Sequence, residues 1–70
     1  MAKSHSDDAD RTGRLFATLT GRLEDAHELA VEGQNPRASA LDGKKLLRRL
    51  QRRLAACDAT VAEIAELLGR

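Results

Sequence analysis

Few side chains in this sequence are of the kinds that perform chemistry, and they lie far apart along the chain. Cys57 is the only cysteine, and His5 and His27 are the only histidines among 70 residues. A nucleophilic cysteine needs a base beside it and an electropositive, accessible setting. Cys57 instead falls within an apolar helical repeat, where a cysteine usually serves as a small buried residue, and His27 falls at the edge of another repeat. We therefore predict no catalytic residue and no enzymatic activity.

Two short patterns suggest metal or phosphate binding, and neither is complete. His5, Asp7 and Asp8 offer three ligands close together, without the fourth that a stable metal site requires. The pair Gly43-Lys44 matches the end of a phosphate-binding loop, but the earlier glycine, the preceding strand and the following Ser or Thr of that loop are missing. The sequence therefore predicts no metal site and no cofactor.

The strongest chemical signal is a run of positive charge near the middle of the chain. Side chains of this kind could bind a nucleic acid through its phosphates. Against this, the formal net charge is only +1, Phe16 is the only aromatic residue that could stack on a base, and an acidic run extends from Glu24 to Glu32. We favour a solvent-exposed face of a helical bundle, with RNA or DNA binding as the alternative. The six basic residues are Lys44, Lys45, Arg48, Arg49, Arg52 and Arg53.

Two stretches of helical periodicity must position these side chains. The first, predicted over residues 10–32, is preceded by a polar, unpatterned segment, residues 1–9, which we predict to be a flexible tail. Gly33 and the pair Asn35-Pro36 then break the pattern, and we place a turn at residues 33–38. The apolar heptad positions of the first helix are Phe16, Leu19, Leu23, Ala26 and Ala30, and Leu15 and Leu29 add a third row.

The second helix, predicted over residues 39–69, carries the clearer repeat. A stripe of three apolar rows is typical of a helix inside a bundle rather than of a two-stranded coiled coil. No strand-like alternation appears, so the predicted fold is all-α. One row is Ala40, Leu47, Leu54, Val61 and Leu68, the next is Gly43, Leu50, Cys57 and Ile64, and Leu46 and Leu67 belong to the third.

A short connection makes the two helices antiparallel neighbours, so we predict a two-helix hairpin. Pairing large residues with small or medium ones gives a register in which Leu23 faces Leu50 and Phe16 faces Cys57. A capping-box pattern at Thr60 leaves one alternative, a three-helix bundle in which the second helix breaks near Asp58.

The predicted hairpin lacks apolar cover at one end. The first predicted helix offers little opposite the last turns of the second, and a chain of 70 residues rarely stabilises a core alone. The simplest partner is a second copy, which gives a homodimeric four-helix bundle; a larger, different protein is the other option. The predicted interface residues are Leu46, Leu54, Val61, Ile64, Leu67 and Leu68.

Composition and hydropathy exclude several classes of protein. A single cysteine cannot form an intramolecular disulfide, which argues against a disulfide-stapled secreted domain. The sequence shows neither the apolar run of a signal peptide nor a stretch long enough to cross a membrane. We expect a cytoplasmic protein that binds no membrane. Its predicted role is that of a non-enzymatic, self-associating adaptor or regulatory subunit acting through its apolar helix faces.

Overall fold

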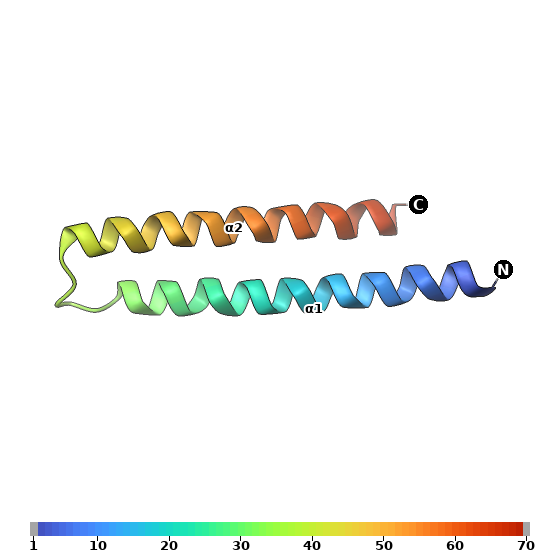
Figure 1. Ribbon diagram of the computed structural model, residues 1–70, viewed down its shortest axis with the longest axis horizontal. Helices are drawn as coiled ribbons and strands as arrows, with labels where there is room; N and C mark the ends of the chain where they lie inside the picture. The colour runs from blue at the N-terminus through green and yellow to red at the C-terminus, as the bar shows by residue number, and fades with distance from the viewer. Residues whose placement is uncertain (1, 70) are drawn as a thin grey trace.

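Two long antiparallel helices form a hairpin in the computed structural model, which describes residues 2–69, with side chains from residue 9 onward. Helix α1 spans Ala2–Gly33 and helix α2 spans Ala40–Leu68. The helices lie side by side, and the first turns of α1 extend past the end of α2 (Figure 1). The hairpin measures 58 × 14 × 11 Å, and residues 2–69 contain no strand. The predicted all-α, two-helix hairpin is confirmed.

The bounds of the helices differ from the prediction in ways that affect packing. Helix α1 begins at Ala2, so the segment predicted as a flexible tail, residues 1–9, is helical from residue 2. Gly33 is the last residue of α1, and the connection is residues 34–39 rather than 33–38. Helix α2 continues without interruption past Asp58, so the three-helix alternative is wrong.

The connection ends in a cap that fixes the start of α2. Ser39 has an extended backbone (φ −73°, ψ 163°), and its Oγ accepts a hydrogen bond from the backbone N–H of Asp42 at 3.1 Å. The Asp42 carboxylate accepts in return from the Ser39 N–H at 3.4 Å, which completes a capping box. Earlier in the connection, the side-chain oxygen of Asn35 accepts from the N–H of Arg37 at 3.0 Å and turns the chain.

Two of the three apolar rows on each helix form the contact between the helices. The remaining row, that of Phe16 and Leu23 on α1 and of Leu47 and Leu54 on α2, points away from it: Phe16 and Leu23, which the sequence predicts in the core, are 49% and 48% exposed. The cause is geometric, because a stripe of three rows is wider than the strip that one neighbouring helix covers. The side chains buried between the helices are Ala26 and Leu29 of α1 and Cys57, Thr60, Ile64 and Leu67 of α2.

A polar contact crosses the middle of this apolar seam. The guanidinium of Arg22 donates through Nη1 to the carbonyl oxygen of Ala56 at 3.2 Å and also to the hydroxyl of Thr60. The same hydroxyl donates to the Ala56 carbonyl at 3.0 Å. Thr60 is fully buried, and a buried hydroxyl is tolerated when it is hydrogen-bonded. The contact therefore links the two helices at one defined position.

The observed register differs from the predicted one. Three α1 residues spaced seven apart each lie between two α2 residues spaced four apart, so Leu23 lies level with Cys57 and not opposite Leu50. Figure 1 shows the cause: the first turn of α2 extends past the last turn of α1 at the connection. Arg22 contacts Ala56 and Thr60. Leu15 lines one hollow together with Glu63 and Leu67, and Leu29 lines another together with Arg49 and Arg53.

Candidate interaction surface

The apolar row that lies outside the contact leaves large side chains exposed on both helices. Their exposed fractions lie between 46% for Leu54 and 66% for Leu68. Single exposed apolar residues are ordinary on protein surfaces, whereas a continuous row of them indicates an interaction site. We call this row the open apolar face; it consists of Phe16 and Leu23 of α1 and Leu47, Leu54, Val61 and Leu68 of α2.

These exposed residues lie on one side of the hairpin. The two antiparallel helices meet through the same two heptad rows, so a cross-section of the hairpin shows them as mirror images. Any other row that the two helices share, next to the contact, therefore lies on the same side of the hairpin. The opposite side shows this arrangement directly, because Asp25 of α1 and Arg49 of α2 occupy equivalent rows and line one hollow together. The row of Phe16 and Leu23 therefore lies beside the row of Leu47 and Leu54.

The side opposite the open apolar face is charged. One hollow there, of about 110 Å³, brings the acidic residues Asp25, Glu28 and Glu32 of α1 to Arg49 and Arg53 of α2. A second hollow, of about 100 Å³, is lined by Arg11 of α1 together with Glu63 and Glu66 of α2. Acidic and basic segments thus lie beside each other on this side of the hairpin. The hairpin is amphipathic as a whole, with one apolar and one charged side.

The structure divides the six predicted interface residues into three groups. Leu54, Val61 and Leu68 are exposed on the open apolar face. Ile64 and Leu67 are only 5% and 9% exposed, because the observed register brings the part of α1 around Leu15 beside the last turns of α2. The sixth residue, Leu46, is half-buried and lines a hollow at the connection.

The six basic residues of α2 are all exposed but do not share one environment. Arg49 and Arg53 line the hollow that contains the α1 carboxylates. Opposite charges across such an exposed hollow contribute about 0–1 kcal/mol per pair. The other four basic residues do not line that hollow and lie further round the exposed surface of α2; they are Lys44, Lys45, Arg48 and Arg52.

A hollow on α1 has the form of a hole in a helix–helix interface. It has a volume of about 400 Å³ and is lined by Thr20, Leu23, Glu24, His27 and Glu28. Four of these residues stand at positions i, i+3, i+4 and i+7, which is the set that surrounds an inserted side chain in knobs-into-holes packing. Leu23 belongs to the open apolar face, whereas Glu28 also lines the hollow on the charged side, so this hollow lies on the outer surface of α1.

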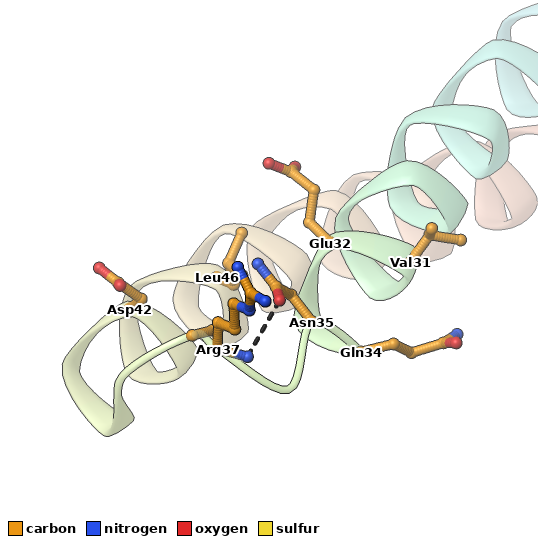
Figure 2. Close-up of a pocket in the computed structure, with 8 residues that line it drawn as sticks. Val31, Glu32, Gln34, Asn35, Arg37, Asp42 and Leu46 are labelled. Carbon is orange, nitrogen blue, oxygen red and sulfur yellow. Dashed lines mark hydrogen bonds between the residues drawn. The ribbon is translucent and has the colours of Figure 1, made fainter.

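A larger, more polar hollow of about 530 Å³ lies at the connection (Figure 2). It is an open depression on the surface. The projecting first turns of α2 and the turn at Asn35 and Arg37 border it, with Leu46 at its base and Asp42 at its rim. Its side chains show no set of ligands for a metal and no nucleophile.

The cysteine and histidine side chains that the structure describes show no catalytic arrangement. Cys57 is free and buried in the seam, and His27 is exposed beside Leu23. The described part of the chain contains no group of three His, Cys, Asp or Glu residues suited to a metal ion; His5, Asp7 and Asp8 lie outside the residues with described side chains. Over the described residues, neither helix has an apolar stretch sufficient to cross a lipid bilayer.

Sequence reasoning missed the contact between Arg22 and Thr60. An arginine in a row that also holds Leu15 and Leu29 is a signal, because long basic side chains can lay their stems on apolar surface and reach a polar partner. Thr60 in the corresponding row of α2 is the second signal. Neither signal specifies that the two residues meet, since that depends on the register.

Comparison with known proteins gives no relative from which a function could be transferred. No protein-family model matches the chain, and neither a curated protein nor a solved structure shows significant similarity to it. The class defined by the fold is a two-helix hairpin with one open apolar face.

Proposed function

We propose that the protein is a non-enzymatic helical subunit that forms a homodimeric four-helix bundle through its open apolar face and acts as an adaptor or regulatory subunit. The observation that carries the proposal is the row of large apolar side chains left 46–66% exposed along one side of the hairpin. A second copy presents the same row, so the two apolar faces can cover each other while both charged sides remain in water. The result is a four-helix bundle with a closed apolar core.

The size of the face supports such a partner. Full burial of a Leu-sized side chain contributes about 2 kcal/mol, so the exposed half of each of the six residues retains roughly 1 kcal/mol. Twelve such side chains in a dimer contribute on the order of 12 kcal/mol, against an association cost of about 4–15 kcal/mol. The burial that a second copy supplies is therefore of the same order as the cost of association.

The dimer also accounts for where the charges lie. Its outer surface would present the mixed charges of both copies, including Asp25 and Arg49 of each hairpin. A surface of this kind is suited to further protein contacts, which is the basis for the adaptor role. The cytoplasmic location expected from the sequence stays a prediction.

Multi-angle light scattering of the purified chain tests the proposal. We expect a mass of twice 7.6 kDa that falls toward the mass of one chain on dilution, measured from about 1 mM to about 1 μM, where an apolar contact of this size should dissociate. A helical, cooperatively melting chain that keeps the single-chain mass at the highest concentration would overturn the proposal. A chain that is unfolded alone and becomes helical only with a different protein would favour a hetero-partner instead.

Nucleic-acid binding is the second candidate, and one observation favours it. Four of the six basic residues are exposed and do not line the hollow shared with the α1 carboxylates. The test is a mobility shift with duplex DNA and with single-stranded RNA at about 50 mM salt, where binding through phosphates is strong. Binding that weakens steeply as salt is raised supports this candidate, and no shift at micromolar protein removes it. The four residues are Lys44, Lys45, Arg48 and Arg52.

A further inference from the structure

The open apolar face has unequal halves, and this inequality bears on how two copies meet. On α2 the row carries four large residues, beginning with Leu47 and ending with Leu68. On α1 it carries only Phe16 and Leu23 as large residues, with Ala9 and the exposed Ala30 at the ends of the same row. Dense packing requires large side chains to meet small ones or gaps. The α2 row, with four large side chains, is therefore best covered by an α1 row, with only two.

The register of the hairpin makes the two rows complementary in the positions of their side chains along the helix axis, as well as in side-chain size. Arg22 lies between Ala56 and Thr60, which fixes the position of α1 along α2. In this register the α1 residues of the open apolar face are level with points midway between the large residues of the α2 row. By this register the side chain of Leu23 lies level with the gap between Leu54 and Val61. Phe16 likewise lies level with the gap between Val61 and Leu68, and Ala30 with the gap between Leu47 and Leu54.

Only one of the two symmetric face-to-face arrangements uses this complementarity. A two-fold axis parallel to the helices places α1 of each copy over α2 of the other with no shift along the helix axis. An α1 residue that is level with an α2 residue of its own chain is therefore also level with the same α2 residue of the other copy. A two-fold axis perpendicular to the helices places α2 over α2 and α1 over α1. That second arrangement sets leucine against leucine on one side and leaves the alanines of α1 facing each other on the other.

Building on the proposed function, we infer that the two hairpins pack with their connections at the same end of the bundle, α1 of each copy over α2 of the other. Leu54 of each copy then packs between Leu23 and Ala30 of its partner. The homodimer contains two such symmetric contacts, one on each side of the two-fold axis.

Distances between spin labels on the two copies test the arrangement. The label is attached to Arg37→Cys in the connection and, in a second variant, to Asp10→Cys near the opposite end, each in a Cys57→Ala background that removes the native thiol. Because neighbouring helices in a bundle lie about 10 Å apart, we expect label-to-label distances of roughly 20–30 Å at both sites. Light scattering and helicity of each labelled variant, measured first, establish that it is folded and dimeric.

The outcomes separate the arrangement from the proposed function. Short distances at both sites support connections at the same end. Distances approaching the 58 Å length of the hairpin in a dimeric sample overturn the arrangement and leave the homodimer standing. Folded variants with single-chain mass, and an unlabelled wild type that behaves alike, overturn both the arrangement and the homodimer.

Discussion

Replacing Leu54 with aspartate should separate the two copies. The Leu54 side chain is 46% exposed in the hairpin, so about half of its apolar surface is free to be covered by the second copy. Loss of the remaining apolar burial removes roughly 1 kcal/mol per copy, or about 2 kcal/mol per dimer. This alone weakens the dimer about 30-fold. Burial of two carboxylates adds several kcal/mol more.

The matched control is Leu41→Asp. Leu41 is 59% exposed and lies in the first turn of α2. It follows Ala40, which belongs to the row of Leu47 and Leu54, so it is turned away from the open apolar face by about 100°. The control makes the same chemical change and the same change in net charge. Sedimentation equilibrium should give an unchanged dissociation constant for Leu41→Asp and a constant raised at least about 30-fold for Leu54→Asp.

A milder variant keeps the test informative if Leu54→Asp fails to fold. Leu54→Ala leaves helix propensity high and should weaken the dimer by roughly tenfold, since it removes most of the same apolar burial without adding charge. Equal dissociation constants for wild type, Leu54→Ala and Leu54→Asp would refute the reasoning. Equal weakening by Leu54→Asp and Leu41→Asp would show that net charge, and not the open apolar face, controls association.

Three further predictions concern the hairpin itself, and each is checked by denaturant or thermal unfolding or by thiol labelling at fixed protein concentration. Ser39→Ala removes the helix cap and should lower the free energy of unfolding by about 1 kcal/mol; unchanged stability would contradict the capping box. Thr60→Val keeps the side-chain shape but removes the hydroxyl that Arg22 contacts, and should cost about 1–2 kcal/mol; the loss should shrink in an Arg22→Met background, whereas an equal loss in both backgrounds would show that the two residues are not coupled. Cys57, at 5% exposure, should react with a thiol reagent only as fast as the seam opens, so labelling that does not slow relative to the unfolded chain would contradict its burial.

The number of helices and their antiparallel arrangement follow from the sequence because both depend on local signals. The heptad pattern specifies two helices, and Gly33 with Pro36 marks the break between them. Ser39 is the N-cap of the second helix because its hydroxyl and the Asp42 carboxylate each satisfy a backbone N–H. Such signals act within a few residues and need no knowledge of the tertiary contacts.

The choice of rows in the contact could not be predicted, because it depends on how the helices face each other. Three apolar rows compete for a contact that holds two. Phe16 and Leu23 lie outside it, while Arg22, which charge alone would assign to the surface, reaches Thr60 inside. The register is a second nonlocal property. It depends on how far α2 extends past α1 at the connection, which the pairing of large and small residues does not reveal.

These differences change the predicted interface without removing it. The sequence predicts that Ile64 is bare because the predicted register sets it opposite a part of the first helix that has few large apolar residues. The observed register instead brings the part of α1 around Leu15 beside the last turns of α2, and Ile64 is buried within the hairpin. The unpartnered surface is instead one whole side of the hairpin, on which Leu54 and Val61 lie. A substitution at Ile64 would therefore unfold the hairpin and could not isolate the contact between copies.

Isotope-filtered nuclear Overhauser measurements on an equal mixture of ¹³C-labelled and unlabelled chains test most directly whether a second copy covers the open apolar face. We predict contacts between copies from the methyl groups of Leu54 and Val61, and none from those of Leu41. Methyl groups of Leu54 and Val61 that show contacts only within their own chain, in a sample concentrated enough for the measurement, would contradict the homodimer.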